Sequence, residues 1–437
     1  MNKKIIIVGA GLAGSEAAYQ LATHGFNVEL IEMRPFNQTE AHKTGYCAEL
    51  VCSNSLKSTL LTTPSGLLKE ELKLLNSIIL KKAYENAVPA GQSLAVDRLN
   101  FSKGVTCDLE QFTNINIIRR EIVSLTELIC DYLIIATGPL TSKNLTDYLK
   151  TLFGDNLYFY DAIAPIVTAD SIDYNYSFFA SRYDKGEADY LNCVINKEDF
   201  DNFYNALINA ETIKYKEFEK PHYFEDCLPI EELARRGKDT LLFGPFRPVG
   251  LKVNGKRPYA VLQLRKENAS GSSYNLVGCQ TKMIHSEQKR VFSLIPALKN
   301  AEYLRLGSMH RNTYINSPHI LGKNFSVKNN SKIYFIGQLT GVEGYIASTA
   351  SGLIAAYDII FKENNMFFEL PVDTALYAIS NYHLTYNKKH FVPSNFHFDM
   401  LPPLGINERD KRKRKLLYSD RALNSLNTFI KEVAVLI

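Results

Sequence analysis

The chain has 437 residues, of which 46% are apolar and 22% are charged. This is the composition of a folded globular protein and excludes a disordered or fibrous chain. A formal net charge of +4 is too small to indicate a nucleic-acid partner by itself. The seven cysteines show no CxxC spacing, which argues against a disulfide framework and a zinc site and favours a reducing compartment. The length predicts about two or three domains.

The sequence predicts neither a signal peptide at residues 1–14 nor a transmembrane span in its longest apolar stretch. The apolar run at residues 5–8 is too short for a signal peptide. The longest largely apolar stretch, residues 346–361, contains Ser348, Ser351 and Asp358 and is not typical of a transmembrane span. We therefore expect a cytoplasmic protein with no membrane contact.

The first predicted element is a buried parallel strand over residues 5–8, followed by a Gly-x-Gly-x-x-Gly turn and a helix over residues 15–23. In such a turn the first glycine allows the tight bend, the second lets a pyrophosphate approach the backbone, and the third lets helix and strand pack closely. The helix N-terminus offers free N–H groups to the phosphates.

A second strand over residues 27–32 ends in Glu32, eighteen residues after Gly14. A carboxylate at this place holds the ribose of an adenine dinucleotide. The alternative is an ordinary βαβ unit with a glycine-rich turn. The predicted cofactor-binding residues of these first two strands are Gly9, Ala10, Gly11, Leu12, Ala13, Gly14 and Glu32.

Helical periodicity predicts one helix over residues 66–86. Two more buried strands follow, at residues 131–136 and 332–336, and each runs into a glycine turn. These turns, with Gly138, Gly337 and Gly341, are typical of flavoproteins with two dinucleotide folds, and a helix from residue 347 follows the second turn.

The fold prediction is therefore an α/β, Rossmann-like two-dinucleotide-fold flavoprotein with an inserted smaller α/β domain. The expected boundaries are 1–185 for the first part of the FAD-binding domain, 186–324 for the insertion, and 325–437 for the second part. The last part carries the basic run at residues 411–415 (KRKRK), which is either a solvated helix face or a patch that contacts phosphates.

Several longer motifs go beyond a generic flavoprotein. They occupy residues 48–55 (AELVCSNS), 227–245 (CLPIEELARRGKDTLLFGP) and 337–345 (GQLTGVEGY), with shorter matches at 95–98, 309–313 and 401–404. In this order they resemble the folate- and FAD-dependent tRNA (uracil-5-)-methyltransferases over nearly the whole chain. A related flavoprotein family that installs carboxymethylaminomethyl groups on wobble uridines shares the fold but is larger and has different cysteine motifs.

The resemblance departs from the family pattern at three positions. Cys47 and Gln92 stand where an aromatic residue and a glycine are expected, and Ala347 stands where glutamate is expected. These changes leave the chemistry-bearing cysteines intact but bear on the shape of the substrate pocket.

The resemblance implies the reaction. The methylene carbon of 5,10-methylenetetrahydrofolate is transferred, with reduction through FAD and NAD(P)H, to carbon 5 of a uridine in RNA. The favoured substrate is the T-loop uridine of tRNA, and the product is 5-methyluridine. A uridine of ribosomal RNA is the alternative substrate, because the chemistry at carbon 5 is the same. Two different functions also stay open, a flavin-dependent NAD(P)H oxidoreductase without RNA methylation and a non-catalytic RNA-binding flavoprotein.

Two cysteines are the predicted catalytic residues. Carbon 5 of uracil becomes nucleophilic only after a thiolate adds to carbon 6, and a base must later remove the carbon-5 proton. We assign the addition to Cys227, which precedes Arg235 and Arg236 in its motif, and the base or methylene-handling role to Cys52. Which thiol has which role stays open.

Four more cysteines and three arginines complete the candidates. We expect Cys107, Cys130, Cys193 and Cys279 to be small buried hydrophobic residues. Arg98, Arg265 and Arg311 lie in or near matched motifs, where folate glutamates or RNA phosphates are possible ligands and structural ion pairs are the alternative.

Overall fold

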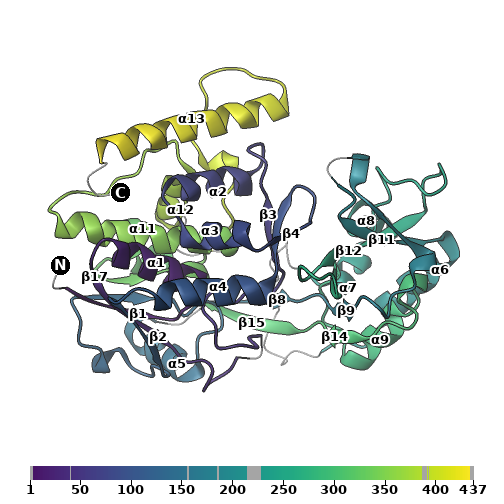
Figure 1. Ribbon diagram of the computed structural model, residues 1–437, viewed down its shortest axis with the longest axis horizontal. Helices are drawn as coiled ribbons and strands as arrows, with labels where there is room; N and C mark the ends of the chain where they lie inside the picture. The colour runs from purple at the N-terminus through teal and green to yellow at the C-terminus, as the bar shows by residue number, and fades with distance from the viewer. Residues whose placement is uncertain are drawn as a thin grey trace.

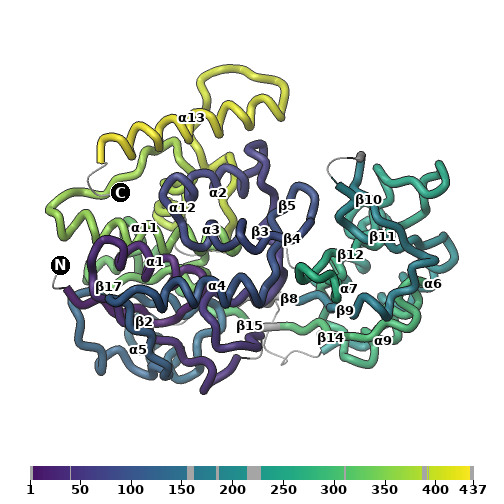
Figure 2. The backbone as a smooth tube through the Cα atoms, viewed as in Figure 1, coloured from purple at the N-terminus to yellow at the C-terminus, as the bar shows by residue number. Residues whose placement is uncertain are grey.

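The computed structural model describes residues 3–39, 41–154, 157–184, 187–213, 228–385, 391 and 393–433, with residues 157–161, 184, 310 and 311 described by their backbone alone. Two lobes stand side by side (Figure 1). The large lobe contains both ends of the chain, and the small lobe is formed by the middle of the sequence, shown in teal and green in Figure 2.

A six-stranded sheet in the order β16-β17-β7-β1-β2-β6 forms the centre of the large lobe. Its strands are parallel except for the β16–β17 pair. Because β1 pairs with β2 on one side and with β7 on the other, the turns after these strands meet at one edge of the sheet. The strands are β1 (Lys4–Val8), β2 (Asn27–Glu32), β6 (Ile115–Arg119), β7 (Tyr132–Ile135), β16 (Ser326–Val327) and β17 (Asn330–Phe335).

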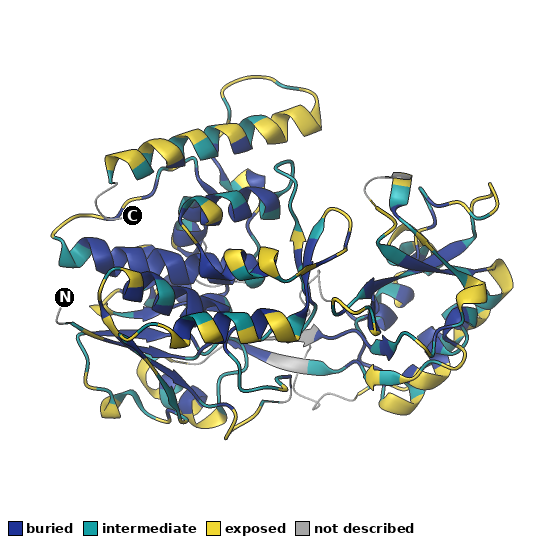
Figure 3. Cartoon of the chain, viewed as in Figure 1, coloured by how far each residue is buried: buried dark blue, intermediate teal, exposed yellow. Residues whose placement is uncertain are grey.

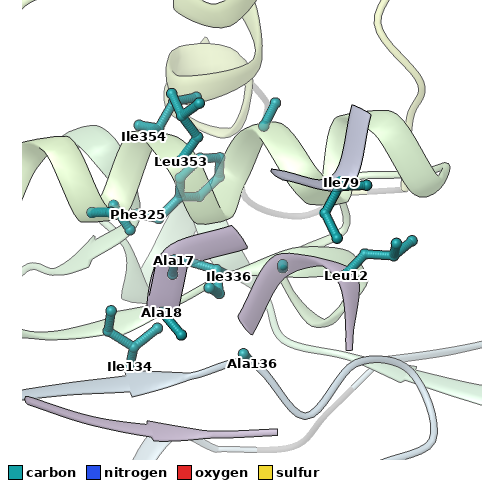
Figure 4. Close-up of a cluster of buried hydrophobic side chains, with 14 of the residues drawn as sticks. Leu12, Ala17, Ala18, Ile79, Ile134, Ala136, Phe325, Ile336, Leu353 and Ile354 are labelled. Atoms are coloured by element: carbon teal, nitrogen blue, oxygen red, sulfur yellow. The ribbon is translucent and has the colours of Figure 1, made fainter. Parts of the chain in front are cut away.

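Two buried helices, α1 (Leu12–Thr23) and α11 (Tyr345–Glu363), cover one face of this sheet. Figure 4 shows Ala17 and Ala18 of α1 among Leu353, Ile134 and neighbouring apolar side chains. A Cβ atom on Gly14 would lie 1.9 Å from the carbonyl oxygen of Gly9. One on Gly352 of α11 would lie 2.1 Å from the carbonyl oxygen of Ala13. The close packing of strand, α1 and α11 therefore depends on glycine at both positions.

The single helix predicted over residues 66–86 is wrong. Two helices occupy this segment, α2 (Pro64–Leu74) and α3 (Ile78–Glu85). Asn76 between them has a left-handed backbone with φ 54°, and the Ser77 side chain caps α3 by accepting the Leu80 N–H. An N-cap serine starts a new helix, and the continuous apolar spacing concealed this break.

The small lobe is built on an antiparallel six-stranded sheet in the order β10-β11-β12-β13-β9-β14. Its strands are β9 (Ile166–Thr168), β10 (Ser177–Ala180), β11 (Tyr190–Ile195), β12 (Ala260–Lys266), β13 (Ser273–Leu276) and β14 (Tyr303–Arg305). The helices of this lobe are α6 (Lys197–Ile208), α7 (Ile230–Arg235), α8 (Lys238–Phe243) and α9 (His285–Phe292). Its apolar core is separate from that of the large lobe. The domain boundaries at 185/186 and 324/325 stay a prediction.

Two small sheets lie between or beside these lobes. One contains β3 (Ser55–Ser58), β4 (Ala87–Val88) and β5 (Ser93–Val96), and the other contains β8 (Leu157–Ala162) and β15 (Met309–Tyr314). The remaining helices are α4 (Arg98–Glu110), α5 (Lys143–Phe153), α10 (Ser317–Ile320), α12 (Ala375–Thr385) and α13 (Lys411–Glu432).

The last helix, α13, lies across the large lobe with most of its surface exposed (Figure 3). In the described part of the chain no helix has the length and apolar character needed to cross a membrane.

Candidate functional site

A first cavity lies where the parallel strands β1, β2, β7 and β17 end. Of the predicted cofactor-binding residues, those that line it are Gly9, Gly11, Leu12, Ala13, Glu32, Gly138 and Gly337. Ala10 and Gly14 lie behind this surface: the Ala10 N–H bonds to Glu32, and Gly14 packs on Gly9. Gly341 packs against the ring of Phe391. The structure thus brings most of the predicted residues to one cavity.

The buried carboxylate of Glu32 is held by four N–H donors. One oxygen accepts from the Arg34 backbone N–H at 3.1 Å and from Arg34 Nε at 2.9 Å. The other accepts from the Ala10 N–H at 2.9 Å and from Arg34 Nη2 at 3.1 Å. Burial alone raises the pKa of Glu32, but Arg34 brings it below its ordinary value. Glu32 is therefore a fixed negative charge. A ribose hydroxyl that donates to Glu32 would share a carboxylate oxygen with the N–H donors already bonded to it.

The first cavity fits a dinucleotide cofactor at its phosphate end. Gly11 is the N-cap of α1, and a Cβ atom on it would meet no atom within 4 Å. Open space beside the first turn of a helix, whose N–H groups lack intrahelical partners, suits a phosphate group. The residues present therefore fit FAD.

A second cavity, of about 530 Å³, adjoins the first. The two share part of their lining, namely Val51, Pro139, Leu140, Gln338 and Tyr345. Cys52 lines the second cavity, next in the chain to the shared Val51. A group bound in the first cavity and a molecule bound in the second would therefore meet beside Cys52.

The backbone around Cys52 is clamped from both lobes. The Cys52 N–H donates to Tyr345 Oη at 2.8 Å, and the carbonyls of Leu50 and Cys52 accept from Arg98 at 2.8 and 2.9 Å. The carbonyl of Val51 accepts from Arg305 Nη2 at 2.9 Å. These bonds fix the position of Cys52.

One of the arginines that hold this loop, Arg98, also forms a buried ion pair between the lobes with Glu267. Arg98 Nε donates to Glu267 at 2.6 Å and Nη2 donates to it at 3.3 Å. For Arg98 the predicted structural ion pair is therefore the observed role. Arg265 also lines the second cavity, and its Nε donates to Asn54 Oδ1 at 2.8 Å. The side chain of Arg311 lies outside the described residues.

A hydrogen-bonded pair completes the wall of the second cavity. Gln338 Nε2 donates to both carboxylate oxygens of the buried Glu343, at 2.9 and 3.0 Å. Both residues line the cavity. A glutamine and a glutamate side chain fixed in this way present their oxygen atoms as hydrogen-bond acceptors in a set orientation, which suits recognition of the N–H groups of a heterocyclic ring.

The second predicted catalytic residue, Cys227, lies outside the described residues. Cys193 and Cys279 are buried as expected, and burial raises the pKa of the Cys193 thiol to about 12. Cys130 is partly buried. For Cys107 the prediction is wrong, because this residue is exposed: it falls on the outward face of α4.

Sequence reasoning missed three residues of the site. Arg34 follows Glu32 by two residues, and this spacing was the available signal. Tyr345 lies inside a matched motif, but its hydrogen bond to a residue 293 positions away has no local signature. Arg305 lies in no recognised motif. In the described part of the chain no group of His, Cys, Asp and Glu is arranged to hold a metal ion.

Comparison with known proteins decides the family. Methylenetetrahydrofolate–tRNA-(uracil-5-)-methyltransferase TrmFO of Persephonella marina is 51% identical over 429 residues, covering 98% of each chain. TrmFO of Bacillus subtilis is 50% identical over 99% of this chain and 100% of its own length. The chain belongs to the TrmFO family.

The family model for glucose inhibited division protein A also matches this TrmFO-family chain, over residues 4–366. The solved structure of Aquifex aeolicus GidA, in its form II crystal, superposes with a TM-score of 0.72 over 100% of this chain and 74% of its own, at 13% identity. At that identity the likeness shows the fold alone. The predicted family and fold class are confirmed.

Proposed function

We propose that this TrmFO-family protein transfers the methylene carbon of 5,10-methylenetetrahydrofolate to carbon 5 of a tRNA uridine, forming 5-methyluridine with FAD as cofactor and NAD(P)H as reductant. The observation that carries the proposal is the position of Cys52, beside the join of two cavities, one of which fits a dinucleotide. A dinucleotide-linked reaction on a second molecule needs such a join.

The residues that would hold FAD are those of the first cavity. The turn around Gly11 and the N-terminus of α1 would bind its phosphates, and the Glu32–Arg34 pair would face its ribose. When bound, FAD supplies the redox chemistry that converts a methylene carbon into a methyl group.

The cysteines carry the chemistry on uracil. Cys227 adds to carbon 6 as a thiolate, which forms a sulfur–carbon bond and moves an electron pair onto the carbon-4 oxygen. Carbon 5 then takes the one-carbon unit, Cys52 removes the carbon-5 proton, and Cys227 leaves. Tyr345 and Arg98 act as positioning residues, because they hold the backbone of Cys52.

The exposed basic run at residues 411–415 is proposed to contact tRNA phosphates. It forms the first turn of α13, where cations face the positive end of the helix dipole and cost stability. Asp410 offsets part of this cost by accepting the N–H groups of Arg412 and Lys413 at 2.7 and 3.0 Å. Neutralising the run is expected to make the salt dependence of tRNA binding shallower. An unchanged slope would assign it to an ordinary solvated surface.

The function is tested by incubating the protein with NAD(P)H, methylenetetrahydrofolate labelled in its methylene carbon, and either unmodified tRNA or unmodified ribosomal RNA. Labelled 5-methyluridine at one position of tRNA is expected. Label only in ribosomal RNA would favour the alternative substrate, and NAD(P)H oxidation without label in either RNA would favour an oxidoreductase. We also propose a cytoplasmic location, in keeping with the free thiols of the six described cysteines.

A further inference from the structure

Arg265 is a buried cation at the wall of the second cavity. It lies on β12 of the small lobe, and only 7% of its surface is exposed. Its Nε donates to Asn54 Oδ1, and the Asn54 amide is itself anchored to the carbonyls of Val96 and Lys266 at 3.0 and 2.9 Å. The guanidinium therefore has a fixed orientation.

The two terminal nitrogens of Arg265 are not used by this anchoring. Among the residues that the structure describes, Nη1 and Nη2 of Arg265 have no hydrogen-bond acceptor, while the side chain lines the same cavity as Cys52. Neither terminal nitrogen is among the described buried atoms that lack a partner, so both are accessible from the cavity that Arg265 lines. A guanidinium fixed at a cavity wall, with terminal N–H groups that no described residue accepts, is placed to donate to a ligand.

The charge around Arg265 is also unbalanced. Three guanidinium groups, those of Arg98, Arg265 and Arg305, bond to residues 50–54. Glu267 is a carboxylate that acts on all three. Both oxygens of Glu267 are already bonded to Arg98. Burial and the repulsion of Arg98 lower the pKa of Arg265 despite Glu267. This region therefore favours an additional negative charge.

We propose that Arg265 stabilises the negative charge that develops on the carbon-4 oxygen of the target uracil when a cysteine thiolate adds to carbon 6. The inference rests on the proposed function. In this step the sulfur–carbon bond forms, the carbon 5–carbon 6 π pair shifts toward carbon 4, and the carbonyl π pair moves onto oxygen. When carbon 5 takes the one-carbon unit, the electron pair on the carbon-4 oxygen re-forms the carbonyl. Formation and collapse of the oxyanion therefore need no reactant beyond those of the methyl transfer.

The uracil oxyanion is favoured as the partner of Arg265 over two other anions. A folate glutamate carboxylate and an RNA phosphate also accept from a guanidinium, but both carry their charge before the reaction. Arg265 lies beside Cys52, which is the residue proposed to act on carbon 5 of the same ring. A preorganised donor in a dry site is worth most where charge appears during the reaction.

The test uses the full-length holoenzyme and tRNA carrying tritium at carbon 5 of uridine. Each methyl transfer releases that tritium, and release is followed in a single turnover with enzyme in excess at saturating methylenetetrahydrofolate and NAD(P)H. Arg265→Gln is expected to lower the rate constant about 100-fold, with the Kd for tRNA and the dependence on folate concentration unchanged. Arg265→Lys keeps the positive charge but loses the paired N–H donors of the guanidinium. Its rate constant is expected to lie between those of the wild type and Arg265→Gln. Arg290→Gln, at an exposed ion pair of the same lobe, is the matched control.

Flavin content and unfolding midpoint confirm that each variant is folded. A normal rate constant for Arg265→Gln at saturating folate and tRNA would overturn the proposal. A requirement for more folate in that variant would then assign Arg265 to the folate carboxylate, and weaker tRNA binding would assign it to a phosphate. A wild-type protein that releases no tritium would instead overturn the proposed function.

Discussion

The two adjoining cavities are built in different ways. The first is formed by turns that directly follow neighbouring parallel strands, and the contacts around its buried carboxylate are short in sequence: the Ala10 N–H bonds to Glu32, 22 residues away. The second is formed by a loop of the large lobe clamped by distant residues, with Cys52 and Tyr345 293 positions apart and Arg98 and Glu267 169 apart. The carboxylate of the first cavity is thus fixed within one βαβ unit, although strands distant in sequence complete that cavity. The second cavity depends on how the two lobes meet.

The largest expected effect concerns the first cavity. Gly11→Asp would place a carboxylate in the open space beside the N-terminus of α1, where a phosphate is expected. We expect this variant to fold but to be purified without flavin absorbance. Gly11→Ala, whose added methyl group meets no protein atom, is the control and is expected to keep at least part of the flavin. Full FAD content in Gly11→Asp would show that the phosphates bind elsewhere.

This contrast also explains what the sequence could predict. The strands at 5–8 and 27–32 and the glycine turn are local patterns, and the structure has them as β1, β2 and the start of α1. The importance of Cys52 came from a family motif. Its bond to Tyr345 is a long-range contact within the large lobe and its bond to Arg305 is a contact between lobes, and no short pattern encodes either. The exposure of Cys107 was missed because the usual burial of cysteine does not fix which face of a helix a given cysteine occupies.

The second cavity should be sensitive to the contact between lobes. Arg98→Met would leave Glu267 buried without its partner and is expected to lower the free energy of unfolding by about 3–5 kcal/mol. Methyl transfer should be lost as well, because the carbonyls of Leu50 and Cys52 lose their donor. Urea unfolding and a methylation assay measure the two effects.

The double variant Arg98→Met/Glu267→Gln separates these effects. It removes both charges, so stability should largely return while methyl transfer stays low. If methyl transfer returned together with stability, Arg98 would be a partner of Glu267 only, and the clamp would not position Cys52.

The smallest expected effect is a pH dependence of the free energy of unfolding, caused by one buried carboxyl group of α1. Glu16 of α1 is fully buried and bonded to Gln20, Ser77 and the Ile79 N–H, and burial raises its pKa from 4.5 to about 7. The folded state thus retains a proton that the unfolded state loses. The stability due to this group is complete below pH 4.5 and is lost as the pH rises through 7.

Glu16→Gln does not titrate. The difference in free energy of unfolding between wild type and this variant is therefore expected to change by about 3 kcal/mol between pH 4.5 and pH 8. Glu110→Gln, at the exposed end of α4, should follow the wild-type curve. Parallel curves for Glu16→Gln and wild type would contradict the protonation of buried Glu16.

The most direct test of the proposed site is methyl transfer by Cys52→Ala, measured with tRNA, labelled methylenetetrahydrofolate and NAD(P)H, beside the exposed-cysteine control Cys107→Ala. If the chemistry takes place where the two cavities meet, Cys52→Ala keeps its flavin and loses methyl transfer, while Cys107→Ala keeps both. Full methyl transfer by Cys52→Ala would contradict the assignment of the reaction to this site.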